Sequence, residues 1–182
     1  TEPGHDHPSR NITVEGCRIW SACNALKIGT ETHDCFENIV FRDCDFHAMV
    51  NMGFVSQFTE DVTCLRVRIA PPANTIRTCP CWADGMQFSG CKGDILVDSC
   101  VFSGLQDDAI NVHGTYLRII KKVGGNKLLV RFMQPQSRGF AAFAPGDEIA
   151  VVQHATMREH AGNPRRKVTS VTPMPGDDTR GD

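Results

Sequence analysis

The stretch NIVFRDCDF, residues 38–46, sets the pattern from which the fold of this chain can be predicted. Apolar side chains stand at its second, fourth, seventh and ninth positions, so the alternation typical of a strand is interrupted once in the middle. The same pattern recurs in NITVEGCRI (11–19), DVTCLRVRI (61–69) and DILVDSCVF (94–102). Four such segments indicate a repeat protein, in which each repeat is one structural unit.

Two short strands joined by a kink and repeated about every 25 residues describe the coils of a parallel β-helix. The inward side chains of one coil would then lie on those of the next, at the spacing of about 4.8 Å between paired strands. The Pro-rich stretch APPANTIRTCPCWA, residues 70–83, is the expected long loop of the third coil. An ordinary β-sandwich is the alternative, and four matching segments make it the weaker one. We therefore predict an all-β chain built on a right-handed parallel β-helix.

Nine cysteines in 182 residues raise the question of disulfides or zinc ligands. Six of them hold repeating positions in the predicted coils: Cys17, Cys44, Cys64, Cys100, Cys35 and Cys91. We expect these six to be buried, reduced thiols that pack as small apolar side chains. Three cysteines remain, Cys23, Cys79 and Cys81, and the pair Cys79-Pro-Cys81 has the wrong spacing for a zinc knuckle, so no metal is expected at cysteine.

The sequence changes in character after residue 114. The stretch YLRIIKKVGGNKLLVRFMQ, residues 116–134, places Gly-Gly-Asn between two alternating runs, which is typical of a β-hairpin. We therefore expect β-helix coils at 1–114 and a small antiparallel barrel or sandwich, inserted and incomplete, at 115–182. Coils without a capping repeat also indicate a piece of a longer chain.

Composition argues against several classes of partner. The formal net charge is −2 and the isoelectric point is near 6.3, which gives no electrostatic reason to bind nucleic acid or an anionic membrane. The apolar runs are too short to span a bilayer, so membrane insertion is not expected either. The chain has no initiator Met and no signal-peptide pattern at its start. Nothing in the sequence predicts an oligomeric state.

Three carboxylates are expected to converge on one patch of the outer wall. A further strand is predicted at NALKI (24–28), DGMQF (84–88) and DAINV (108–112), which align with one another. Asp84 and Asp108 then hold equivalent corners of adjacent coils, and Asp107 is the residue before the second of them. The outward positions beyond these corners hold Gln87, Asn111 and His113, because alternate side chains of a strand share a face.

Glycoside hydrolysis requires such a set of carboxylates. One protonated acid gives its proton to the leaving oxygen, and another carboxylate activates water. We expect Asp84 and Asp108 to hold that water jointly, and Asp107 to stand apart from the pair as the proton donor. Trp82 can stack on the apolar face of a sugar, and Gln87, Asn111 and His113 can take its hydroxyl groups. Turn aspartates that cap coil corners, or a Ca²⁺ site, are the alternatives.

The stretch WADGMQFSGCKGDILVDSCVFSGLQDDAINVHGTYL, residues 82–117, resembles the signature region of glycoside hydrolase family 110. The resemblance implies a bacterial, exo-acting, inverting α-1,3-galactosidase, with a parallel β-helix and inserted β-barrel subdomains. It places the three catalytic residues on Asp84, Asp107 and Asp108. The implied substrate is a glycan that ends in α-1,3-linked galactose, and no cofactor is implied. It also implies a longer enzyme of which this chain is an internal piece, and a periplasmic or secreted location.

Two other classes of function remain open. Polygalacturonases also place one Asp and a later Asp-Asp on this fold, and β-helix lyases use Ca²⁺ to act on acidic polysaccharides. An acidic substrate calls for an outward Arg or Lys cluster near the aspartates, and the sequence has no evident one. A β-helix that binds sugar without catalysis is the third class.

Overall fold

The computed structural model describes residues 8–28, 35–134, 137, 140, 142–160, 162 and 165–173. The described residues form strands, turns and loops with no α-helix, and no candidate membrane-spanning helix is found among them. They group into two compact units, residues 1–140 and residues 141–182. The first unit contains the coils, with Asp84, Asp107 and Asp108.

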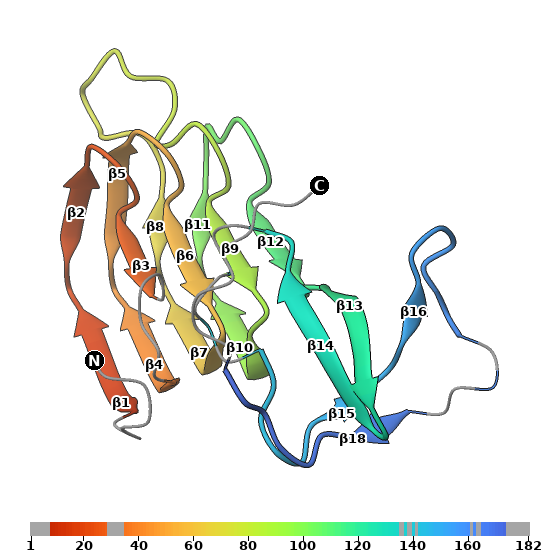
Figure 1. The fold of residues 1–182 in the computed structure, drawn as a ribbon. Helices are drawn as coiled ribbons and strands as arrows, with labels where there is room; N and C mark the ends of the chain where they lie inside the picture. The colour runs from red at the N-terminus through yellow and green to blue at the C-terminus, as the bar shows by residue number, and fades with distance from the viewer. Residues whose placement is uncertain are drawn as a thin grey trace. The chain divides into compact units, whose positions relative to one another are not determined.

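The predicted repeats form three parallel sheets of four strands each (Figure 1). The first sheet contains β1 (Ser9–Glu15), β4 (Phe36–Arg42), β7 (Thr59–Leu65) and β10 (Lys92–Asp98). The second contains β2 (Arg18–Ser21), β5 (Asp45–Met49), β8 (Arg68–Ile69) and β11 (Val101–Phe102). The third contains β3 (Leu26–Ile28), β6 (Phe54–Gln57), β9 (Met86–Ser89) and β12 (Ile110–His113). Each coil gives one strand to each sheet, which confirms the parallel β-helix.

The register of the strands is the one that the repeats predict. Ile12 pairs with Ile39, Ile39 with Val62, and Val62 with Ile95. In the second sheet Ile19 pairs with Phe46, Phe46 pairs with Ile69, and Ile69 pairs with Phe102. Because side chains alternate along a strand, a slip by one residue would turn every one of these apolar groups outward.

Burial is deepest in the two middle coils. Ile39 is 2% exposed and Val62 is fully buried, whereas Ile12 in the first coil is 40% exposed and Ile110 in the fourth is 41% exposed. The difference follows from the topology, because only the middle coils have a paired coil on both sides. Aromatic rings pack between the second and third coils in the interior. Phe54 lies between Phe41 and Phe88, with ring centroids 4.8 and 5.6 Å away.

The cysteines are all free thiols, and two of the six that were expected to be buried are fully buried. Cys44 and Cys64 are buried, and Cys17, Cys91 and Cys100 on or beside the outer strands are half-buried. The expectation was wrong for Cys35, which is exposed because it precedes β4 and lies outside the inward columns. Cys79 and Cys81, which the repeats did not account for, are buried in the long loop.

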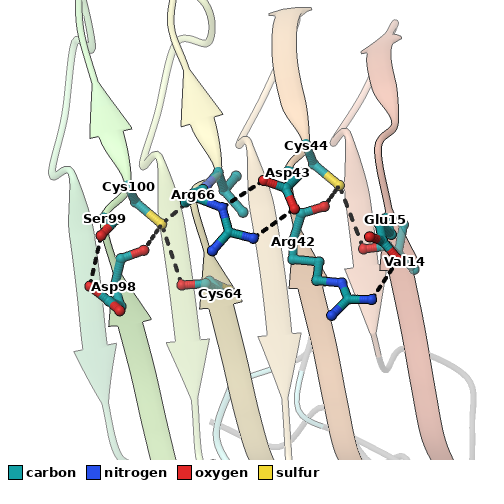
Figure 2. Close-up of polar contacts among 11 residues, drawn as sticks. Val14, Glu15, Arg42, Asp43, Cys44, Cys64, Arg66, Asp98, Ser99 and Cys100 are labelled. Atoms are coloured by element: carbon teal, nitrogen blue, oxygen red, sulfur yellow. Dashed lines mark hydrogen bonds and ion pairs between the residues drawn. The ribbon is translucent and has the colours of Figure 1, made fainter.

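The turn between the first and second strand of each coil forms the kink corner, residues 15–18, 42–45, 65–68 and 98–101. Its thiols point inward and donate to backbone carbonyls: Cys44 Sγ lies 3.6 Å from the Val14 oxygen, and Cys100 Sγ lies 3.4 Å from the Cys64 oxygen (Figure 2). Burial raises the pKa of the Cys64 thiol to about 12, so this thiol stays neutral.

The outer side of the kink corner carries paired charges (Figure 2). Arg42 Nη2 donates to Glu15 Oε2 at 2.7 Å, and the Arg66 guanidinium donates to both oxygens of Asp43, each at 2.7 Å. These hydrogen bonds from Arg66 lower the pKa of Asp43 below its ordinary value. Each pair links a coil to the next one, so the charges follow the stack.

Pairing changes from parallel to antiparallel between β12 and the hairpin of β13 (Leu117–Gly124) and β14 (Lys127–Phe132). The hairpin turns at Gly125 and Asn126, as the Gly-Gly-Asn stretch predicts. Within the first unit, the Phe58 ring at a coil corner contacts Phe132 and Phe140, with centroids 5.8 and 4.5 Å away.

The second unit is also antiparallel where it is described. There β15 (Glu148–Ile149) pairs with β18 (Arg166–Lys167), and β16 (Val152–Gln153) pairs with β17 (Arg158–Glu159). The boundary between segments 1–114 and 115–182 stays a prediction. Residues 1–7 and 174–182, the outer ends of these segments, lie outside the described residues.

Candidate active site

The acidic corner, residues 84, 107 and 108, lies where the chain passes from the second sheet to the third. The Gly85 N–H donates to the Asp108 carbonyl at 2.8 Å, and the Gly53 N–H donates to the Asp84 carbonyl at 3.0 Å. Two residues later Met86 pairs with Ile110. Asp84 and Asp108 therefore hold equivalent places in neighbouring coils, as the aligned strands predict.

Two glycines let the coils approach closely at this corner. A Cβ added to Gly85 would lie 2.7 Å from the Ala109 carbonyl oxygen, and one added to Gly53 would lie 2.4 Å from the Gly85 oxygen. Both distances are shorter than a side chain tolerates against backbone, so only glycine fits. Asp84 stands directly beside this contact, and the close stack fixes its backbone relative to that of Asp108.

The three carboxylates lie together. One oxygen from each of Asp84, Asp107 and Asp108 lies within 4.8 Å of the others. Asp84 is 5% exposed, while Asp107 and Asp108 are open to solvent. One buried and two exposed carboxylates therefore lie together on the outer wall. Carboxylates arranged in this way can share protons or a water molecule.

The expectation that Asp107 stands apart from the other two aspartates is not met. Asp107 Oδ1 accepts a hydrogen bond from the Asp108 backbone N–H at 3.0 Å. This bond holds the Asp107 carboxylate over the turn that contains it, close to Asp84 and Asp108. Aspartate commonly closes a turn in this way, because its short side chain reaches a neighbouring amide.

Asn111, Gln87 and His113 face outward from β9 and β12, as predicted, and they form two separate sets. Asn111 pairs with Gln87 across the strands, and its Nδ2 donates to Asp84 Oδ2 at 3.1 Å. Gln87 Nε2 instead contacts His113 Nε2 at 3.0 Å. One polar residue therefore touches the acidic corner directly, and the other two hold each other farther along the wall.

Trp82 belongs to the long loop that leads to Asp84, and its side chain is 66% exposed. The Trp82 backbone N–H donates to the Asn51 carbonyl at 3.1 Å, which ties this part of the loop to the second coil. An exposed indole can stack on the apolar face of a sugar, and the contact of Trp82 with a sugar stays a prediction.

Two loop residues hold this segment in place, a role that the sequence did not predict for either of them. Arg77 donates from Nε to the Cys79 carbonyl at 2.8 Å and from Nη2 to the Met49 carbonyl at 2.9 Å. The Cys81 thiol is buried and donates to the Ala83 carbonyl at 3.3 Å. A lone arginine in a Pro-rich loop gives no sequence pattern that would have identified this role.

In the part of the chain that the structure describes, the three aspartates make no salt bridge with an arginine, lysine or histidine. They are also the one group of three His, Cys, Asp or Glu residues there with ligand atoms close enough to hold a metal ion. Ca²⁺ takes six to eight oxygen ligands, so three carboxylates would supply three to six of them and water or backbone carbonyls the rest. Carboxylates that lack a cation can also exchange protons in acid–base chemistry.

Comparison with known proteins places these features in context. The chain is 40% identical to an alpha-1,3-galactosidase A of Akkermansia muciniphila over 162 residues, which are 89% of this chain and 25% of that protein. It is 44% identical to an alpha-1,3-galactosidase A of Bacteroides fragilis over 136 residues, 75% of this chain and 22% of that protein. An alpha-1,3-galactosidase B of Bacteroides fragilis is 37% identical over 82% of this chain and 25% of its own length.

The later part of the chain has its own match. Residues 127–179 match the family described as GLAA-B beta-barrel domain II, where the sequence predicts a small barrel or sandwich. The chain spans about a quarter of the length of the curated relatives that it matches. By its sequence it belongs to glycoside hydrolase family 110, the family of the α-1,3-galactosidases.

Proposed function

We propose that the acidic corner hydrolyses a terminal α-1,3-linked galactose in the polypeptide that contains this chain, with inversion at the anomeric carbon. The observation that carries the proposal is the meeting of three carboxylates within 4.8 Å on an exposed wall. Its specificity for galactose rests on the relatives that are named alpha-1,3-galactosidases. The proposed partner is therefore a glycan with terminal α-galactose, reached by a periplasmic or secreted enzyme.

Asp107 is the proposed general acid. Its Oδ1 is occupied by the Asp108 N–H, so Oδ2 is the oxygen that carries the proton to the glycosidic oxygen. As the bond between C1 and that oxygen breaks, a water held between Asp84 and Asp108 attacks C1 from the opposite face. The proton lost by the water passes to one of these two carboxylates, and β-galactose is released.

The separation of the acids requires one movement in this mechanism. Acid and base stand roughly 6.5–9.5 Å apart in inverting enzymes, to leave room for sugar and water, and roughly 5–5.5 Å apart in retaining enzymes. We propose that the bound sugar rotates Asp107 about its Cα–Cβ bond, away from the pair. The rotation breaks one hydrogen bond, that between Asp107 Oδ1 and the Asp108 amide.

Four further residues supply contacts in this proposal. Trp82 stacks on the apolar face of the sugar, and Gln87 and His113 take hydroxyl groups along the wall. The pair of Gln87 and His113 is ordered before the sugar arrives, because each side chain already holds the other. The proposed contact of Asn111 is considered separately below.

The test is to measure galactose release by the natural polypeptide from α-1,3-, α-1,4- and α-1,6-linked digalactosides. We expect release from the α-1,3 linkage alone, with β-galactose as the first product in a ¹H NMR time course. First appearance of α-galactose would show a double displacement and overturn inversion. Cleavage of polygalacturonate, or activity that EDTA abolishes and Ca²⁺ restores, would replace the proposal by the acidic-polysaccharide alternative.

A further inference from the structure

The Asn111 side chain joins two coils at the acidic corner. It projects outward from β12 of the fourth coil, and its Nδ2 lies 3.1 Å from Oδ2 of Asp84 in the third coil. Asp84 is nearly buried, so few other groups can reach this oxygen. An amide nitrogen can only donate, and the hydrogen bond therefore commits Oδ2 of Asp84 as an acceptor.

Gln87 stands in register with Asn111 but is engaged elsewhere. His113 Nδ1 lies 3.1 Å from the Gly114 carbonyl, which can only accept, so the proton of the neutral ring is on Nδ1. His113 Nε2 then accepts the N–H of Gln87 at 3.0 Å. One N–H of Gln87 is thereby used by His113, and the amide that donates to Asp84 is that of Asn111.

We propose that Asn111 is a positioning residue for Asp84, in place of the sugar contact predicted from the sequence. This role rests on the proposed function, in which Asp84 and Asp108 hold the attacking water. With Oδ2 fixed by Asn111, the other carboxylate oxygen of Asp84 is the one that faces the water. Loss of the hydrogen bond would let the Asp84 carboxylate rotate, and a displacement of about 1 Å can cost on the order of 100-fold in rate.

The test compares two substitutions of Asn111 in the natural polypeptide. Asn111→Ala removes the donor, and we expect kcat to fall by about 10- to 100-fold with KM within twofold of the wild type. Asn111→Asp puts a further carboxylate against Asp84, at the position of the lost donor, and opposes its ionisation. The acidic limb of the plot of kcat/KM against pH is therefore expected to move to higher pH by about one unit or more.

A matched control is available in the second coil. Asn38 Nδ2 also donates across coils, to Asn11 Oδ1 at 2.7 Å, but on the first sheet and away from the acidic corner. Asn38→Asp makes the same chemical change there, and we expect kcat, KM and the pH profile to stay as in the wild type. Asp107, Asp108 and His113, the other titratable groups at the corner and on β12, are unchanged in every variant.

A direct titration separates this proposal from the proposed function. The ¹³C resonance of the Asp84 carboxylate should titrate at higher pH in Asn111→Asp than in the wild type, whether or not the protein turns over a galactoside. An unmoved Asp84 titration, or an Asn111→Ala variant with raised KM and unchanged kcat, would overturn the positioning role. Absence of galactose release by the wild type would overturn the proposed function alone.

Discussion

Two corners of the same solenoid treat their carboxylates in opposite ways. At the kink corner, Glu15 meets Arg42 of the next coil and Asp43 meets Arg66 of the coil after that (Figure 2). At the acidic corner, three aspartates from two coils meet, and within the described residues none of them forms a salt bridge. The spacing between coils is the same at both corners, so the difference lies in the residues.

The two corners differ in whether their carboxylates have a cationic partner. Exposed ion pairs contribute little each to stability, so the arginines at the kink corner mainly neutralise the acids of the neighbouring coil. At the acidic corner, the narrow backbone contact at Gly53 and Gly85 holds the acids together without an arginine. Carboxylates that lack a cation remain available to protonate and deprotonate a substrate.

The largest expected effect comes from removing an acid at the acidic corner. Asp107→Asn and Asp108→Asn should each lower kcat on the natural galactoside by about 10²–10⁴-fold. On an aryl galactoside with a good leaving group, Asp107→Asn should recover much of its activity, because that oxygen needs no proton. Asp108→Asn should stay impaired, because the water still needs its base, and azide can replace that water.

Kinetics on both substrates check this division of roles. Recovery of the aryl substrate by Asp108→Asn alone would exchange the two roles. If both variants kept full activity, the aspartates of the acidic corner would be structural, as the carboxylates of the kink corner are. The two corners would then not differ in function.

An intermediate effect is expected from making the acidic corner resemble the kink corner. Met52 stands one coil before Asp84, because the following residues Gly53 and Gly85 are joined in the backbone ladder. Met52→Arg would bring a guanidinium to Asp84 as Arg42 is brought to Glu15. A guanidinium in contact with a carboxylate stabilises its ionised form by about one to three pKa units. The carboxylate is then a weaker base, so kcat should fall about tenfold or more.

Leu96→Arg on the outer face of β10 adds the same charge on a different sheet and serves as its control. We expect the Leu96 variant to keep the kcat of the wild type, and both variants to keep its thermal midpoint within a few degrees. Equal kcat in the two arginine variants would show that an unpaired Asp84 is not required.

The smallest effect is expected at the kink corner itself. Arg66 lowers the pKa of Asp43 below its ordinary value of 3.8, so the stability that this pair adds is present above pH 3.8. It is lost as the pH falls through the lowered pKa of the folded state. Asp43→Asn should therefore lower the thermal midpoint slightly at pH 7 and leave it unchanged near pH 2, with full activity at neutral pH. A drop in kcat would contradict the separation of the two corners.

The stacking of the coils could be predicted because strand alternation and coil register are local properties. One strand escaped the alignment, β6, because it reverses the usual alternation of apolar and polar residues. Ser56 of β6 points inward and is satisfied by Thr59, to whose Oγ1 it donates at 2.9 Å, while Val55 faces outward and is buried nonetheless. Polar residues in a core break the pattern on which such predictions depend.

At the candidate site, the meeting of Asp84 and Asp108 followed from the repeat, but the orientation of Asp107 did not. One hydrogen bond in a turn decides that orientation, and neighbouring residues of a turn can point in several directions. The contact of Asn111 with Asp84 was also hidden in the sequence, since the alternation places Asn111 on a face without saying which group it touches.

The close contact of Gly53 and Gly85 has a consequence for how such a solenoid can diversify. The backbone stack sets the distance between Asp84 and Asp108, at the spacing of about 4.8 Å that every parallel sheet shares. Selection cannot readily widen or narrow that gap by point substitutions. The long loop at 70–83 is under no such constraint, because its length leaves the pitch of the coils unchanged. Under the proposed function, a change of substrate would therefore come most easily from changes in this loop, beside carboxylates whose spacing the coils keep constant.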